Sequence, residues 1–187
     1  MINYTLKTKT IHIIGNGITQ AAGMEFISVD DDVWTLNTYI LPVTTLHWDI
    51  HPAWSIGRLT RFHKMSPWCG NPPFVVHPNN IDKIGDATVF DLNLCKEFFG
   101  VGYPYLSNGV CYQLAAGIYL GAEKIYLWGI DQTQDRVEAE WERPCIEFYI
   151  GFAQAKGINV AIPSQSFLLR TFQGGREHYP FFRRDVP

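Results

Sequence analysis

The segment 108–132 constrains the fold more than any other part of this 187-residue chain. The apolar spacing of residues 109–121 predicts a helix that packs on a sheet, and residues 124–128 form a short apolar run of the kind expected in a buried strand. Gly129 follows this run directly, and Asp131 comes two residues later. Because ligands of open α/β sheets bind beyond the carboxyl ends of the strands, Asp131 is our first candidate site residue.

Short β-rich runs alternate with helical patterns along the rest of the chain. Extended segments are expected at residues 10–14, 33–36, 43–48, 74–76, 88–90 and 159–162. A further helix is expected at 144–156, with Pro144 in its first turn and Gly157 at its end. This alternation predicts one single-domain, Rossmann-like α/β unit over residues 1–187, with a mainly parallel sheet and helices on both faces.

Composition and charge exclude several classes of protein. With 47% hydrophobic and 18% charged residues, the chain has the composition of an ordinary globular domain. A net charge of -3 does not provide the positive field that strong nucleic-acid binding requires. The cysteines form no CxxC pair, so we interpret them as reduced core residues rather than zinc ligands or disulfides; they are Cys69, Cys95, Cys111 and Cys145.

The sequence also predicts a location. No stretch approaches the roughly 18 consecutive apolar residues of a membrane-spanning helix, and the first residues lack the apolar centre of a signal peptide. We therefore expect a cytoplasmic protein without a membrane partner. The sequence makes no prediction of an oligomeric state.

Glycine or polar residues follow four of the expected strands. These are Gly15, Asn16 and Gly17 after the first strand, Asn37 after the second, Asp49 and His51 after the third, and Asp131 after the sixth. The carboxyl ends of parallel strands lie at one edge of a sheet, so these groups are expected to converge. Such convergence is what a mononucleotide pocket requires.

Backbone and amide groups supply the candidate ligand contacts. The glycines at 15–17 let backbone N–H groups approach a phosphate without a Cβ atom in the way, although a tight structural turn is the alternative interpretation. Asn37 and Asn108 offer side-chain amides to a base or ribose. Asn108 also competes with Ser107 as the N-cap of the helix that begins at Gly109.

Several ionisable residues are candidates for roles in catalysis or in ligand binding. Asp131 can hold ribose hydroxyls, a metal ion or a proton, or it can serve only as a turn former. His51 is a candidate general acid or base, and because no HExxH motif occurs, no metal site is expected. Arg143 can bind phosphate, with Glu147 as its i,i+4 partner, while Glu138 belongs to an acidic cluster whose alternative is a solvated helix start.

In this order, the motifs resemble the bacterial sialyltransferases of glycosyltransferase family 42 and related uncharacterised phage and bacterial proteins with the same Rossmann-like core. The matching pieces are GNG at 15–17, DVWTLNTYI at 32–40, LHWDIHP at 46–52 and NGVCYQLAAGIYLGAEKIYLWGID at 108–131. The last piece is similar to the family's Ser-Gly helix and its Ile-Tyr-Leu-x-Gly-Ile-Asp strand.

The resemblance implies a set of contacts and a reaction. A cytidine nucleotide would be surrounded by Gly15 to Gly17, Asn37, Ser107 to Gly109, and Gly129 to Asp131. The enzyme would transfer a sugar from a nucleotide-sugar donor, with no metal or other cofactor required.

The chain departs from that family around its last helix. Residues 138–148, EAEWERPCIEF, hold glutamates and an arginine where the family carries a histidine general base. The tyrosines that assist the leaving phosphate in that family have no clear counterparts after Asp131. Residues 138–169 are instead similar to small uncharacterised phage proteins, in which acidic residues precede an Arg-Pro pair.

We therefore expect a nucleotide-dependent transferase, most simply of glycosyl groups, acting in the host cytoplasm if the protein is phage-encoded. Asn16 and Asn37 would contact the nucleotide, and Asp131 would hold its ribose or diphosphate. Arg143 would stabilise the charge that develops on the leaving phosphate.

The identity of the general base and the reaction class leave alternatives open. The base would be Glu138 or His51. One alternative function is a Mg²⁺-dependent pyrophosphokinase-like reaction, which would require carboxylates such as Asp131 and Asp49 as metal ligands. A second alternative is a phage protein that binds or sequesters a nucleotide without catalysis.

Overall fold

The computed structural model describes residues 2–37, 40–51, 72–84, 87–100, 105–132 and 137–169. Within them lies a seven-stranded sheet in the order β5-β4-β3-β2-β1-β6-β7, in which every neighbouring pair is parallel. The strands are β1 (Thr10–Ile14), β2 (Asp32–Leu36), β3 (Leu46–Asp49), β4 (Phe74–Val76), β5 (Ala87–Val89), β6 (Lys124–Trp128) and β7 (Asn159–Ala161). The parallel α/β sheet expected from the sequence is confirmed.

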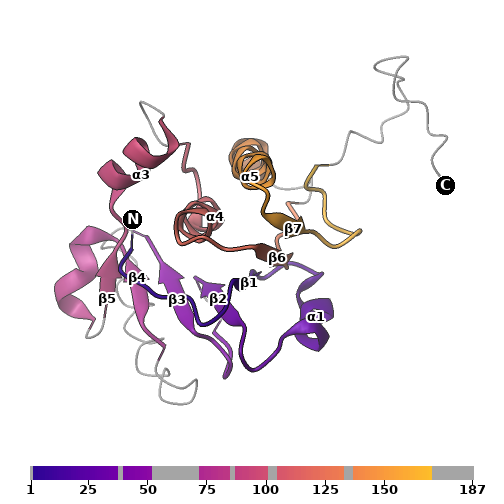
Figure 1. Cartoon of the computed structure of the whole chain (residues 1–187), viewed down its shortest axis with the longest axis horizontal. Coiled ribbons are helices and arrows are strands. Elements are labelled where there is room, and N and C mark those ends of the chain that lie inside the picture. Colours follow the sequence, from indigo (N-terminus) through magenta and orange to yellow (C-terminus); the bar gives the residue numbers. More distant parts are fainter. Residues whose placement is uncertain are drawn as a thin grey trace.

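Helices cover both faces of this sheet. The α-helices are α1 (Gln20–Gly23), α3 (Leu92–Phe99), α4 (Gly109–Tyr119) and α5 (Val137–Ala155), and the 3-10 helices are η1 (Met24–Phe26) and η4 (Pro78–Lys83). Helices α3, α4 and α5 lie on one side of the sheet and α1 on the other (Figure 1). Strand periodicity explains the two layers, because Ile11 and Ile13 join the core under α4 whereas Ile14 joins a second core with Trp128.

Helix α4 is buried almost all round. Its N-cap is Asn108, whose side-chain oxygen accepts from the Cys111 amide at 3.1 Å. It packs so closely on β1 that a Cβ atom at Gly117 would lie 3.1 Å from the Cδ1 atom of Ile11. This close contact sets the N-terminus of α4 at the carboxyl edge of the sheet.

Helix α5 begins earlier than the sequence pattern suggests. Pro144, expected in its first turn, lies inside the helix that runs from Val137 to Ala155. Proline removes the hydrogen bond to the carbonyl of Glu140, but both residues are exposed and water can satisfy that carbonyl. Burial of the opposite face, including Ile146, holds the helix together across the proline. The expected stop at Gly157 is confirmed by its left-handed φ of 81°.

A buried acid begins β2, which the sequence pattern placed one residue later. Asp32 is fully buried and accepts hydrogen bonds from the Tyr4 hydroxyl at 2.6 Å and from the Lys7 amide at 2.8 Å. The carboxylate also accepts from the Thr8 amide at 3.4 Å and from the Thr45 hydroxyl at 3.3 Å. These bonds compensate the desolvated charge and tie the N-terminal segment to the sheet.

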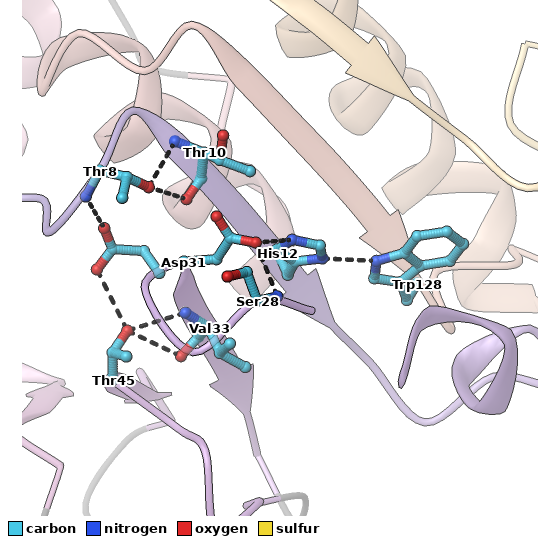
Figure 2. Close-up of polar contacts among 9 residues, drawn as sticks. Thr8, Thr10, His12, Ser28, Asp31, Val33, Thr45 and Trp128 are labelled. Carbon is cyan, nitrogen blue, oxygen red and sulfur yellow. Dashed lines mark hydrogen bonds and ion pairs between the residues drawn. The ribbon is translucent and has the colours of Figure 1, made fainter. Parts of the chain in front are cut away.

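A buried imidazole lies on the face of β1 opposite α4 (Figure 2). His12 is fully buried, its Nδ1 accepts from the Trp128 indole N–H at 3.0 Å, and its Nε2 lies 3.1 Å from the Asp31 carboxylate. Because Nδ1 accepts a hydrogen bond, the ring is neutral and Nε2 donates to Asp31. Burial lowers the pKa of His12, which favours this neutral form.

Two further expectations concern cysteines and membranes. Cys95, Cys111 and Cys145 are buried and unbridged, and burial raises the pKa of Cys111 to about 12. Cys69 lies outside the described residues. In the portion of the chain that the structure describes, no helix is both long and apolar enough to cross a bilayer.

Candidate functional site

A cavity of about 410 Å³ opens where β1, β2 and β6 end. Strands β2 to β5 lie on one side of β1, whereas β6 and β7 lie on the other, so the cavity is at the point where the strand order reverses. Open α/β sheets bind their ligands at this topological switch point.

Most of the candidate residues from the sequence meet at this cavity. Its lining includes Gly15, Asn16, Gly17, Asn37, Asn108, Gly109, Gly129 and Asp131. The expected convergence is therefore present for three of the four strand ends, whereas Asp49 and His51 after the third are not among the lining residues. Whether these residues bind a ligand stays a prediction.

The other candidates are not among the described residues that line the cavity. Ser107 is exposed beside the α4 N-cap, and the Arg143 Nε donates to Glu147 at 2.7 Å, as its i,i+4 spacing predicts. His51 lies beyond β3, where its Nδ1 is 2.6 Å from a carboxylate oxygen of the buried Asp49. Glu138 is part of α5, but its side chain is outside the described atoms.

The loop after β1 lies directly against the end of β6. Gly15 N–H donates to the Trp128 carbonyl and Gly17 N–H to the Gly129 carbonyl, each at 2.8 Å. A Cβ atom at Gly15 would lie 2.5 Å from the Gly129 oxygen, and one at Gly17 would overlap the Asp131 carboxylate. Both glycines are therefore required by close approach of the two backbones.

Asp131 and Thr19 fasten this loop in place. Oδ1 of Asp131 accepts from the Thr19 hydroxyl at 2.5 Å, and Oδ2 accepts from the Thr19 amide at 3.0 Å. The same hydroxyl accepts from the Gly129 amide at 2.9 Å. The sequence pattern did not single out Thr19, although a threonine just before a helix start is a usual capping signal. Here its hydroxyl binds Asp131 instead of capping α1.

The Asn108 side chain, which lines the cavity, has one paired and one unpaired polar atom. Its oxygen caps α4, whereas its Nδ2 is buried and has no hydrogen-bond partner in the part of the chain that the structure describes. Buried donors are nearly always paired, so this amide nitrogen is a candidate partner for an acceptor on a ligand beside Asn108. The positive end of the α4 dipole lies at the same place and favours an anionic acceptor.

Two residues that line the cavity have left-handed backbone conformations. Asn37 has φ of 57° and Gln132 has φ of 48°. Asparagine tolerates this region, but glutamine adopts it rarely, and such conformations concentrate at functional sites. The Gln132 side chain reaches Glu142 on α5, with Nε2 3.4 Å from Oε2. The pattern did not single out Gln132 or Glu142; the signal for Glu142 was its i,i+3 spacing from the buried Ala139.

The charge of the cavity is unusual for a site that binds anions. Among the described residues, its lining contains the carboxylates of Asp131 and Glu142 and no lysine, arginine or histidine. Across the described ranges, no three histidine, cysteine, aspartate or glutamate side chains gather as a metal-ion site. Side-chain amides would donate hydrogen bonds to a ligand here. The helix dipole, rather than a basic side chain, would supply the positive potential.

The parallel sheet with a crevice at its switch point defines a Rossmann-like α/β protein. Among solved structures, the chain is similar to the sialyltransferase CstII from Campylobacter jejuni in complex with the substrate analogue CMP-3FNeuAc, with a TM-score of 0.57, 15% identity, and coverage of 82% of this chain and 79% of that chain. The complex of CstII with cytidine-5'-monophosphate gives a TM-score of 0.58 and 16% identity, covering 86% of this chain and 82% of that chain.

These matches establish a sialyltransferase-like fold, as the sequence motifs suggested. At this level of identity the likeness concerns the fold. No family model matches the chain, and no curated protein gives a significant match.

Proposed function

We propose that this protein is a glycosyltransferase-like transferase that binds a nucleotide-sugar donor in the cavity at the β1/β6 switch point. The observation that carries the proposal is the Asn108 Nδ2 atom, a buried donor at the N-terminus of α4 for which the described protein groups supply no acceptor. A phosphate oxygen or a base carbonyl of the donor would satisfy it.

The size and lining of the cavity support this proposal. A volume of about 410 Å³ is within the range of small-molecule sites, which is about 300 to 1,000 Å³. Asn16, Asn37 and Asn108 place amide groups around it, and such groups can both donate to and accept from a base or a ribose.

The charges favour a donor with a single phosphate. The described lining holds two carboxylates and no basic side chain, so a diphosphate or triphosphate would meet net repulsion there. One phosphate at the α4 N-terminus would be stabilised by the helix dipole alone. The CstII complexes are named for CMP-3FNeuAc and cytidine-5'-monophosphate, and each of these ligands carries one phosphate. We therefore infer a cytidine monophosphate sugar as the donor.

The alternative of Mg²⁺-dependent pyrophosphoryl transfer has less support. It requires Asp131 as a metal ligand, but both oxygens of this carboxylate accept hydrogen bonds from Thr19. The Oδ1 atom of Asp49, the second carboxylate that this reaction would use, accepts from His51. Metal ligation would be limited to the remaining lone pairs of these oxygens.

The experiment is a survey of donors for release of free nucleotide. The purified protein is incubated with CMP-N-acetylneuraminic acid, UDP-glucose, GDP-mannose and ATP, each with EDTA and with Mg²⁺, and products are resolved by mass spectrometry. We expect release of CMP that is unchanged by EDTA. Turnover of ATP only with Mg²⁺ would establish the pyrophosphokinase alternative, and ligand retention without any turnover would establish a sequestering protein.

The origin of the gene is a separate proposal. Residues 138–169 resemble uncharacterised phage proteins, and from this we infer a phage-encoded protein that acts in the host cytoplasm. Phage structural genes on either side of the coding sequence are the expected result, and a chromosomal setting without them would contradict it.

A further inference from the structure

The cavity presents two carboxylates with different surroundings. Asp131 is 5% exposed and lies at the end of β6, whereas Glu142 is half-buried and reaches the cavity from α5. No other ionisable side chain is found in the lining that the structure describes. If the cavity binds a donor, these two residues are the candidates among the described lining for the group that takes a proton during the reaction.

The Asp131 carboxylate already accepts hydrogen bonds from within the protein. Each of its oxygens accepts a hydrogen bond from Thr19, at 2.5 Å from the hydroxyl and at 3.0 Å from the amide. A proton on the Oδ2 lone pair that accepts from the Thr19 amide would face another donor and break that bond. The carboxylate of Asp131 thus has a structural role, because its hydrogen bonds hold the loop in place.

Glu142 is held far more loosely. The hydrogen bond that its carboxylate accepts in the described part of the chain comes from Gln132, with Nε2 3.4 Å from Oε2. This is longer than the usual range of about 2.7 to 3.2 Å for an N–H···O bond, so a ligand hydroxyl can displace it at little cost. Gln132 takes a left-handed conformation next to the cavity, and this conformation accompanies its contact with α5.

The neighbouring charges on α5 are engaged away from the cavity. Arg143 donates from its Nε to Glu147 at 2.7 Å, and the same Glu147 oxygen accepts from the Leu169 amide at 2.6 Å. This arrangement ties α5 to the segment after β7. Glu142, one residue earlier, is the carboxylate of this helix found among the described lining residues of the cavity.

We propose that Glu142 is the catalytic general base that deprotonates the acceptor hydroxyl, an assignment that rests on the proposed glycosyl transfer. The acceptor oxygen forms a bond to the anomeric carbon, and its proton passes to the Glu142 carboxylate. The bond from the anomeric carbon to the phosphate oxygen breaks, and its electron pair leaves on the phosphate of the nucleotide. Glu142 then releases the proton to water, so the products are a glycoside, a free nucleotide and one proton.

Gln132 is a positioning residue in this scheme. Its weak donation to Oε2 orients the carboxylate toward the cavity until a ligand hydroxyl displaces it, and it leaves Oε1 to accept the proton. His51, a candidate base from the sequence, lies beyond β3 and is bound to Asp49. Glu142, the base assigned here, is on α5.

The test compares E142Q with E140Q on the full-length chain. Glu140 is exposed on the same helix and is not among the described lining residues, so its replacement controls for loss of one charge on α5. Two quantities are measured for each protein: affinity for CMP by calorimetry, and release of CMP from CMP-N-acetylneuraminic acid, with water serving as acceptor.

We expect E142Q to bind CMP as the unaltered protein does but to release it about 10² to 10⁴-fold more slowly, the usual contribution of a general base. E140Q should match the unaltered protein in both measurements. A second variant, E142A, should regain turnover when formate is added, because a small carboxylate can occupy the vacated space and accept the proton. A purely structural role of Glu142 predicts no such rescue.

The other outcomes separate this inference from the proposed function. Full turnover by E142Q would overturn the assignment of the base and leave the transferase intact. CMP binding without turnover by the unaltered protein would overturn the assignment and favour a sequestering protein. If the unaltered protein neither binds CMP nor turns over any donor in the nucleotide-release survey, the proposed function fails and the base assignment fails with it.

Discussion

Both carboxylate oxygens of Asp131 bind Thr19, one through the hydroxyl at 2.5 Å and the other through the backbone amide at 3.0 Å. This pair joins the end of β6 to the loop after β1 and so forms the wall of the cavity between them. Asp131, whose position at a strand end suggests a chemical role, has a structural task that the sequence does not reveal.

Removing the Thr19 hydroxyl should loosen this wall. T19V keeps the shape of the side chain but leaves Oδ1 of Asp131 and the Gly129 amide without their partner. We expect the free energy of unfolding in urea to fall by about 1 to 3 kcal/mol, the cost of buried polar groups left unpaired. T5V is the control because Thr5 is exposed. Equal stability of the two variants would contradict the fastening role.

The close contact of the glycine loop makes a second prediction. In G17A the new methyl group would overlap the Asp131 carboxylate, so we expect a loss of about 1 to 3 kcal/mol in stability, as is typical of overpacking. Gly151 lies inside α5 with open space where a Cβ atom would be, and G151A should instead stabilise the helix by about 0.5 to 1 kcal/mol. Thermal unfolding of both variants gives the comparison, and a stable G17A would show that the loop is not pressed against β6.

The periodicity of the apolar residues and the order of the strand-like segments made much of this architecture predictable. The buried run 124–128 and the glycines at 15–17 were recognisable because a strand that ends in glycine has few other interpretations. Start residues were less predictable: Pro144 suggested a helix start, but burial of one face of α5 extends the helix back to Val137. Boundaries of this kind depend on tertiary packing.

Site residues that stand at the end of a strand could be predicted from the sequence. Site residues that only tertiary contacts bring together could not. Asp131, at a strand end, is visible in the sequence. Its partner Thr19 lies 112 positions away, and no local pattern reports that bond. Glu142 was one glutamate among several in an acidic segment, and only the placement of α5 distinguishes it from the exposed Glu140.

The unpaired amide of Asn108 makes a prediction about affinity. N108D and N108S keep an oxygen that can cap α4 through the Cys111 amide, but both lack the Nδ2 donor. Loss of one hydrogen bond to a charged group corresponds to about 1.5 to 3 kcal/mol, so CMP should bind about 10 to 100-fold more weakly to N108S. N108D should be weaker still because its charge repels phosphate. Unchanged affinity in both variants would remove Asn108 from the site.

Stability should depend on pH through His12. Burial lowers the pKa of folded His12 from the usual 6.5, so the unfolded chain takes up the proton first. Stability contributed by the neutral ring is complete above pH 6.5 and is lost as the pH falls from there through the lowered pKa of the folded state. Urea unfolding between these limits should show this loss in the unaltered protein. The same slope in H12Q, whose amide does not titrate, would assign the effect to another group.

Hydrogen–deuterium exchange on addition of CMP tests most directly that the switch-point cavity is a nucleotide site. Slower exchange is expected for backbone amides in residues 15–18, 108–110 and 129–132, which line the cavity. No change is expected in α3, which follows the edge strand β5. Protection confined to other segments, or no protection at CMP concentrations that saturate related transferases, would contradict the assignment of this cavity.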